Sequence, residues 1–224
     1  MNAPQRTARR HRLALFDLDN TLADHRTSLH VRLHHAFEEV FPEEDERTKV
    51  VAASVEITHD GTGHFAQLLA DHGIDAAAVA ERAIERYRSD RYRGLELYVD
   101  TLEAIAQASE HFEIAMITNG PTDIQQPKLD LLGIEELFSF VLISESTGYW
   151  KPDPRIFELA LERAGVPAHE AVYIGDSPDH DMLGAQAAGL TAIWMNRLGL
   201  TWPGGRQPDY EARDLHDALC WLVG

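Results

Sequence analysis

The sequence predicts an α/β fold: a doubly wound parallel sheet with a helical domain inserted into it. Three observations support this prediction. Short apolar runs recur along the chain, and each ends in polar turn residues. Helical patterns lie between most of these runs, an alternation typical of parallel sheets covered by helices on both faces. One interval between two runs is far longer than the others and is helical in pattern almost throughout.

Five runs are predicted to be the strands of the sheet. Their residues are apolar almost without a break, as expected for strands that are buried on both faces. Strands with one solvent-exposed face would instead alternate in polarity. The five runs span residues 13–16, 112–117, 138–143, 171–174 and 190–195.

Helices are predicted between these strands from apolar residues that are spaced three and four apart. In one segment, Ile156, Leu159 and Ala160 fall on a single helical face. Gly189 suits the C-terminal cap of the last segment. The segments outside the long interval span residues 101–110, 123–132, 153–164 and 179–188.

The long interval covers residues 24–96 and is predicted to be a helical cap domain. It exceeds the length of an ordinary strand-to-helix connection. The rest of the chain, residues 1–23 and 97–224, would then form the α/β core. Within the interval, helical patterns span residues 28–40, 64–72 and 75–93.

The composition is that of a globular protein and excludes several kinds of partner. The 224 residues are 44% hydrophobic and 25% charged, with a formal net charge of -17. Nucleic acids and anionic membranes attract basic surfaces, so neither is an expected partner. No apolar stretch reaches the ~18 residues of a membrane span. No secretory signal is recognisable either, so a soluble, cytoplasmic protein is expected, of unknown oligomeric state.

Cysteine and lysine are both rare. The single cysteine, Cys220, lies in an apolar run where a buried thiol is expected, and it excludes an internal disulfide framework. Against 17 Arg the chain has three Lys, namely Lys49, Lys128 and Lys151. Where Arg is so strongly preferred, each Lys is a candidate for a position that requires a compact ammonium group.

Polar residues follow the first two predicted strands. Asp17 and Asp19 come after the first strand, and side-chain alternation in an extended chain turns both toward one site. Thr118, Asn119 and Gly120 follow the second strand. The hydroxyl and the backbone N–H groups of such a turn can bind an anion. Each motif alone also fits an ordinary turn rich in Asp, Asn or Gly.

Further charged groups follow the third and fourth strands. Lys151 lies in the loop after the third strand, and Asp176 and Asp181 follow the fourth. Ligands of open α/β sheets bind outside the carboxyl ends of the strands, where these loops meet. Mg²⁺ prefers an oxygen shell of carboxylates and water, which suits Asp17 and Asp176. One ammonium group among them would balance charge and hold an anionic group.

In this order the motifs resemble those of the haloacid dehalogenase (HAD) superfamily. The resemblance covers nearly the whole chain, and residues 118–196 most resemble the phosphatase branch that contains pyrimidine nucleotidases and acylneuraminate phosphatases. It implies a Rossmann-like HAD core, with residues 24–96 as the family's helical cap. The motifs are Asp17-Leu18-Asp19-Asn20-Thr21-Leu22, Thr118-Asn119-Gly120, Lys151-Pro152 and Gly175-Asp176-Ser177 with Asp181.

The resemblance implies catalytic and phosphate-binding roles. Asp17 would be the nucleophile that forms an aspartyl-phosphate. Asp19 would protonate the leaving oxygen and then activate water. Thr118 and Lys151 would bind the phosphoryl group, with help from the backbone of Asn119.

The resemblance also implies a Mg²⁺ site. Asp17, Asp176 and the backbone carbonyl of Asp19 would bind the ion, and Asp181 would orient the site from the second shell. The implied activity is a Mg²⁺-dependent phosphomonoesterase acting on a small nucleotide, sugar phosphate or phosphoglycolate. Asp19 favours this activity, because members that act as dehalogenases lack the second acid. A phosphomutase and a non-catalytic phospho-acceptor or scaffold domain are the alternatives, and the sequence does not identify the substrate.

Overall fold

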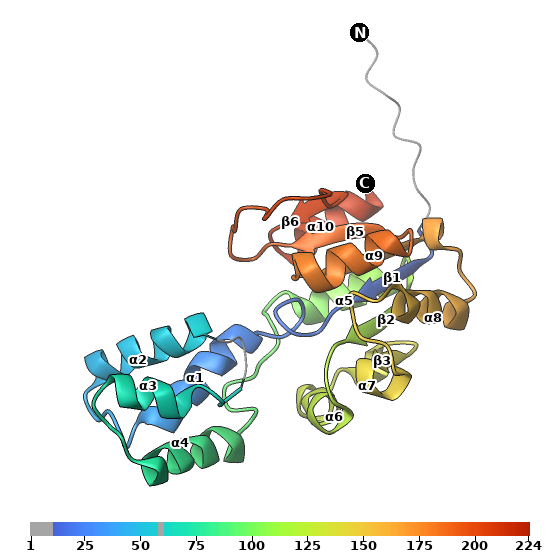
Figure 1. Cartoon of the computed structure of the whole chain (residues 1–224). Coiled ribbons are helices and arrows are strands. Elements are labelled where there is room, and N and C mark those ends of the chain that lie inside the picture. Colours follow the sequence, from blue (N-terminus) through green and yellow to red (C-terminus); the bar gives the residue numbers. More distant parts are fainter. Residues whose placement is uncertain (1–10, 58–60) are drawn as a thin grey trace. The chain divides into compact units, whose positions relative to one another are not determined.

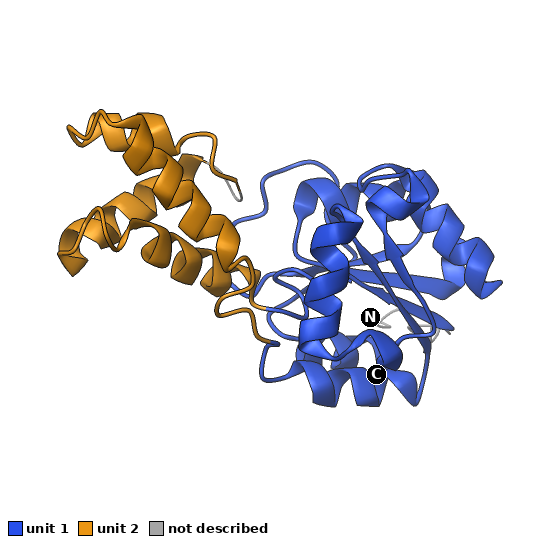
Figure 2. Ribbon diagram, turned by 90° about the horizontal axis from the view of Figure 1, so that it is seen from below, with its two compact units in different colours: residues 1–23, 97–224 blue, residues 24–96 orange. Residues whose placement is uncertain are grey.

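The computed structural model describes residues 11–57 and 61–224. The chain divides into two units, drawn in different colours in Figure 2. Unit 1 combines the residues up to Ala23 with Leu97–Gly224, and unit 2 is the stretch Asp24–Glu96 between them.

Within the described residues, unit 1 contains one parallel sheet of six strands (Figure 1). Their order, β3-β2-β1-β4-β5-β6, confirms the predicted doubly wound fold. The sequence does not predict β6, which is short and carries a Glu at its centre. The strands are β1 Leu13–Phe16, β2 Glu113–Thr118, β3 Val141–Ile143, β4 Ala171–Gly175, β5 Thr191–Met195 and β6 Tyr210–Ala212.

The strand order reverses at β1, which lies between β2 and β4. The chain proceeds from β1 through β2 to β3 and then returns to β4, on the other side of β1. Ligands of doubly wound sheets bind at such a reversal, outside the carboxyl ends of the strands. Phe16 pairs with Ile174, and the backbone N–H of Asp17 donates to the carbonyl of Ile174 at 2.9 Å. The residues that follow these two strands therefore lie side by side.

Helices cover both faces of the sheet. Leu13 and Leu15 of β1 pack in one apolar cluster with Phe157. The alternate residues Ala14 and Phe16 are fully buried as well, so the opposite face is also covered. Helices α8 (Pro154–Ala164) and α9 (Leu183–Ala187) pack together, as do α5 (Thr101–Ser109) and α10 (Leu215–Val223). Burial on both faces explains why the strands are continuous apolar runs in the sequence.

The other helical segments of unit 1 connect the strands. The predicted segment 179–188 is divided into a π-helical turn and α9. None of the helices in the described residues has the length and apolarity to cross a bilayer. The remaining segments are α6 Thr122–Leu132, α7 Ser144–Thr147, and the short turns η1 Glu135–Leu137, η2 Ala168–Glu170 and η3 Pro178–Met182.

The prediction that Cys220 is buried is wrong. In α10 the buried side chains are Leu215, Ala218 and Leu219, which are spaced three and four apart on one helical face. Cys220 follows one residue later, on a different face, and is exposed. The apolar run therefore marks an amphipathic helix rather than a fully buried one.

In residues 24–57 and 61–96, unit 2 consists of four helices around their own apolar core. The rings of Phe37 and Phe65 are 4.7 Å apart, and those of Phe65 and Tyr87 are 5.6 Å apart. Arg32 is only 2% exposed, and its guanidinium lies 4.0 Å from the centre of the Tyr87 ring. The helices are α1 His25–Phe37, α2 Glu44–Ile57, α3 Phe65–Asp71 and α4 Ala77–Ser89.

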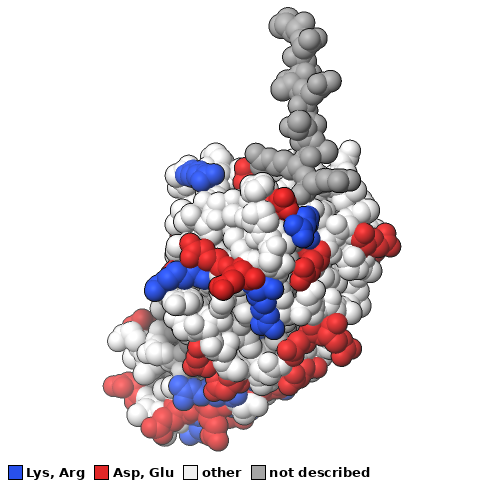
Figure 3. Space-filling view, turned by 90° about the vertical axis from the view of Figure 1, so that its right-hand side faces the viewer, with Lys and Arg blue, Asp and Glu red and all other residues white. Residues whose placement is uncertain are grey.

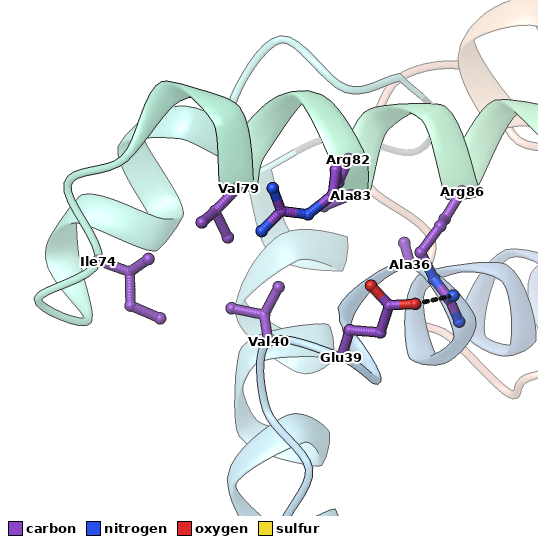
Figure 4. Close-up of a pocket in the computed structure, with 8 residues that line it drawn as sticks. All are labelled: Ala36, Glu39, Val40, Ile74, Val79, Arg82, Ala83 and Arg86. Atoms are coloured by element: carbon purple, nitrogen blue, oxygen red, sulfur yellow. Dashed lines mark hydrogen bonds and ion pairs between the residues drawn. The ribbon is translucent and has the colours of Figure 1, made fainter.

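Helices α1 and α4 border a hollow of about 320 Å³ (Figure 4). Ala36, Val40 and Val79 contribute apolar surface to its lining. Arg86 and Glu39 also line it, and Nη1 of Arg86 donates to Oε1 of Glu39 at 2.6 Å. The hollow is therefore lined by both apolar and charged side chains.

Candidate active site

The loops at the carboxyl ends of the strands bring the predicted site residues into one connected network within unit 1. The contacts begin at the end of β1, include the loops after β2 and β3, and reach the turn η3 after β4. This edge of the sheet is also where the strand order reverses, the usual place for ligands in doubly wound sheets. The residues are Asp17, Asp19, Thr118, Asn119, Lys151, Asp176 and Asp181.

Lys151 lies at the centre of this network and is only 3% exposed. Its Nζ is 2.6 Å from Oδ1 of Asp17 and 2.7 Å from Oδ1 of Asp181. It also lies 2.7 Å from the Tyr173 hydroxyl and 3.1 Å from the Ile117 carbonyl oxygen. Burial alone would lower the pKa of the ammonium, but the two carboxylates raise it above its ordinary value. Lys151 is therefore charged. Its contacts link residues in or directly after three strands, β1, β2 and β4.

Asn119 holds the Lys151 loop in place. Its Oδ1 accepts a hydrogen bond from the Lys151 backbone N–H at 2.9 Å, and its Nδ2 donates to the Lys151 carbonyl at 2.9 Å. The Ser144 hydroxyl donates to the carbonyl of Thr118 at 3.1 Å and also contacts Oδ1 of Asn119. The side chain of Asn119 thus fixes the position from which Lys151 reaches Asp17.

Three carboxylates gather beside this ammonium. Asp17, Asp176 and Asp181 each offer an oxygen, and these oxygens lie within 4.8 Å of one another. Burial, together with the charge of Asp181, raises the pKa of Asp17 to about 7 despite the opposing effect of Lys151. Burial and the charges of Asp17 and Asp181 also raise the pKa of Asp176 well above its usual value. Both shifts therefore reflect first the burial of the carboxylates and then their mutual repulsion, which the Lys151 ammonium does not offset.

The donor set fits a hard divalent cation such as Mg²⁺, because it consists of carboxylate oxygens. The two oxygens of Asp17 differ in how firmly they are held. Oδ1 is bound to Lys151 at 2.6 Å, whereas Oδ2 accepts a long hydrogen bond of 3.4 Å from the Thr21 hydroxyl. The more weakly held Oδ2 is the better candidate for contact with an ion or a substrate.

Asp181 is held by donors at both of its oxygens. Oδ1 accepts from Lys151 and from the Tyr173 hydroxyl, the latter at 3.0 Å, and Oδ2 accepts from the Ser177 backbone N–H at 2.9 Å. A Cβ atom at Gly175 would lie 2.5 Å from Oδ2 of Asp181, so only glycine leaves room for this approach. Asp181 is thus well placed to orient Lys151 and the turn after β4.

Asp19 is bound by a second lysine, which lies outside the motifs recognised in the sequence. Nζ of Lys128, in α6, lies 2.8 Å and 2.6 Å from the two oxygens of Asp19. Gln125, one helical turn earlier, donates to Asp19 at 3.2 Å and also to the Thr118 hydroxyl. The rarity of Lys is the one signal that could have found Lys128, whereas nothing in the sequence distinguishes Gln125.

Most of the acidic residues behind the net charge of -17 lie outside this site. On the face drawn in Figure 3, acidic side chains are spread across the surface with basic ones between them. In unit 2, the lining of a hollow of about 550 Å³ instead includes three arginines, Arg26, Arg47 and Arg93, beside one acidic residue, Glu38. Among the described residues, this hollow and the two buried lysines thus gather positive charge in a chain that is acidic overall.

The chain is similar to known proteins over most of its length. Residues 14–195 match the model of a family described as haloacid dehalogenase-like hydrolase. Phosphoserine phosphatase of Thermus thermophilus is 37% identical over 149 residues, which are 65% of this chain and 59% of that protein. Glyceraldehyde 3-phosphate phosphatase of Methanopyrus kandleri is 31% identical over 213 residues, 91% of this chain and 88% of that protein.

A solved structure shows the same architecture. The HAD-hydrolase YfnB of Bacillus subtilis, in a crystal form bound to magnesium, has a TM-score of 0.79 and 27% identity. The similarity covers 95% of this chain and 99% of that one, so it includes the inserted helices as well as the sheet.

Proposed function

The chain belongs to the haloacid dehalogenase-like hydrolase family, and from this we propose that it releases inorganic phosphate from small phosphate monoesters. The observation that carries the proposal is the buried pair of Asp17 and Lys151 at the end of β1, with 2.6 Å between Oδ1 and Nζ. A carboxylate held beside an ammonium group suits nucleophilic attack on an anionic phosphoryl group.

In the first step, an oxygen of Asp17 attacks the phosphorus atom. A new bond forms between that oxygen and phosphorus while the bond from phosphorus to the ester oxygen breaks. The weakly held Oδ2 is the attacking atom that the hydrogen bonds favour. Asp19, two residues further along the chain, donates its proton to the departing ester oxygen, so the leaving group departs as an alcohol.

In the second step, water hydrolyses the aspartyl-phosphate. Asp19, now deprotonated, accepts a proton from water as the water oxygen attacks phosphorus. The bond between phosphorus and Asp17 breaks, which regenerates the carboxylate and releases phosphate. Lys151 and the Thr118 hydroxyl stabilise the phosphoryl oxygens in both steps.

The carboxylate cluster supports a Mg²⁺ requirement. Asp17, Asp176 and the backbone carbonyl of Asp19 would hold the ion, and Asp181 would orient the site through Lys151 and the Ser177 backbone. The ion would neutralise charge on the phosphoryl oxygens. The raised pKa values of Asp17 and Asp176 support this assignment, since a cation would stabilise the charged carboxylates that burial and mutual repulsion disfavour.

The relatives support a small metabolite as substrate. The names of two relatives specify phosphoserine and glyceraldehyde 3-phosphate as their substrates. For this chain we propose the same chemical class, a small phosphorylated metabolite that includes nucleotides, sugar phosphates and phosphoglycolate.

A phosphate-release screen tests the proposal. A panel of nucleotides, sugar phosphates, phosphoglycolate, phosphoserine and p-nitrophenyl phosphate is incubated with the protein in Mg²⁺ or in chelator. We expect phosphate release with Mg²⁺ and none with chelator, while circular dichroism shows an unchanged fold. Mg²⁺ should also raise the melting temperature, and Asp176→Asn should abolish that rise. An isomeric product without free phosphate would show a mutase instead, and no turnover of any ester would contradict the proposal.

A further inference from the structure

Lys128 and Gln125 form a buried polar clamp on the side chain of Asp19. Lys128 is 5% exposed and Gln125 is 1% exposed, and with Leu129 they are the buried residues of α6. The ammonium of Lys128 contacts both oxygens of Asp19, at 2.8 Å and 2.6 Å. The carboxamide of Gln125 donates to Asp19 and to the Thr118 hydroxyl, and so connects two of the proposed catalytic groups.

Stability alone does not account for this clamp. Taking an ammonium group out of water opposes folding, and apolar residues of similar shape often stabilise a fold as well or better. The chain also prefers arginine elsewhere, yet both buried lysines, Lys128 in α6 and Lys151 after β3, are bound to carboxylates of the first motif. The clamp therefore holds Asp19 for a reason other than packing.

The second motif makes room for the clamp. A Cβ atom at Gly120 would lie 2.6 Å from Cγ of Gln125, so the glycine allows α6 to bring Gln125 against Thr118. Gln125 and Lys128 are three residues apart and therefore point to the same side of the helix. The turn after β2 thus positions both Thr118 and the two residues that bind Asp19.

We propose that Lys128, assisted by Gln125, is a positioning residue that orients Asp19 for its acid and base steps. This inference rests on the proposed function, in which Asp19 transfers protons to and from the reacting oxygens. One oxygen of Asp19 exchanges a hydrogen bond for the ester oxygen or the attacking water, while the other stays on the ammonium. Asp17 and Asp19 are thereby held by separate lysines, Lys151 and Lys128, and are kept in separate roles.

The dependence on leaving group tests this proposal. An alkyl ester needs protonation of its leaving oxygen, whereas the nitrophenolate of p-nitrophenyl phosphate leaves readily without it. Lys128→Met should lower kcat/KM by about 100-fold on the alkyl ester that the wild-type protein hydrolyses fastest, because kcat/KM reports on the step in which the leaving oxygen is protonated. The loss on p-nitrophenyl phosphate should be smaller by roughly tenfold or more. Lys49→Met, which removes an exposed lysine of unit 2, is the matched control and should change neither rate.

A double-variant experiment shows whether Lys128 acts through Asp19. In an Asp19→Asn background, Lys128→Met should cause no further loss on p-nitrophenyl phosphate, because the group that it orients is already disabled. Equal losses on both esters, or losses that add to those of Asp19→Asn, would overturn the proposal. Lys128→Gln replaces Lys128→Met if melting curves show that the latter does not fold. A wild-type protein that hydrolyses neither ester would instead contradict the proposed function.

Discussion

Unit 1 and unit 2 differ in what they bury. Unit 1 encloses Asp17, Asp181 and Lys151 at one edge of its sheet. Unit 2 encloses mainly aliphatic and aromatic side chains, such as Phe37 and Phe65. Buried charge costs stability unless it is paired, whereas buried apolar surface contributes stability directly. The contrast indicates that unit 1 gives up stability for chemistry at its strand ends, while the core of unit 2 serves folding.

The largest expected effect comes from the nucleophile in unit 1. Asp17→Asn should lower phosphate release by about 10⁴-fold or more, since the amide cannot form the covalent intermediate. Phosphate release under saturating substrate measures the effect. Asp71→Asn, at an exposed position of unit 2, removes the same charge and should leave the rate unchanged. Full activity of Asp17→Asn would rule out the mechanism.

The next effect concerns the stability of the charged cluster. Lys151→Met would leave Asp17 and Asp181 buried without their ammonium partner and should destabilise unit 1 by about 3–5 kcal/mol. Urea unfolding followed by tryptophan fluorescence reports on unit 1, because all four Trp lie outside residues 24–96. Lys49→Met is again the control and should leave the midpoint within experimental error. An unchanged midpoint for Lys151→Met would mean that the pairs contribute nothing to the fold.

A smaller effect is the pH dependence of the metal-free protein. Burial raises the pKa of Asp17 from 3.8 to about 7. Between pH 3.8 and about 7, Asp17 is therefore protonated in the folded state and ionised in the unfolded state. This contribution of Asp17 to stability is present below pH 3.8 and is lost as pH rises through about 7. Relative to Asp17→Asn in chelator, the wild-type protein should lose up to about 1.4 kcal/mol per pH unit in this range. Parallel stability curves for the two proteins between pH 5 and about 8 would contradict the shift.

The smallest effect is expected at the surface of unit 2. Arg86 lies 2.6 Å from Glu39 and 3.2 Å from Glu38, and both carboxylates are largely exposed. Glu39→Gln should change the free energy of unfolding by less than about 1 kcal/mol and leave turnover unaltered. Circular dichroism during urea unfolding measures the first quantity. A loss as large as that of Lys151→Met would remove the contrast between the two units.

Much of the fold could be predicted because its signals are local. Strand runs such as 13–16 and helical spacing such as that of Ile156 and Ala160 depend on neighbouring residues alone. The short polar strand Tyr210–Ala212 has no such signal, since it joins the sheet by pairing with β5. Exposed Cys220 shows the same limit, because an apolar run does not reveal which face of a helix is covered.

The chemistry divides in a similar way. Asp17, Lys151 and Asp176 stand in short motifs after strands, so their residue types and their order along the chain are enough to indicate phosphoryl chemistry. The pairing of those charges follows from the order β2-β1-β4 and from the position of α6. In the folded chain, Lys151 forms ion pairs with Asp17 and Asp181, and Lys128 forms one with Asp19. Periodicity and motif order are properties of neighbouring residues, whereas a contact between residues more than a hundred positions apart exists only after the sheet has assembled.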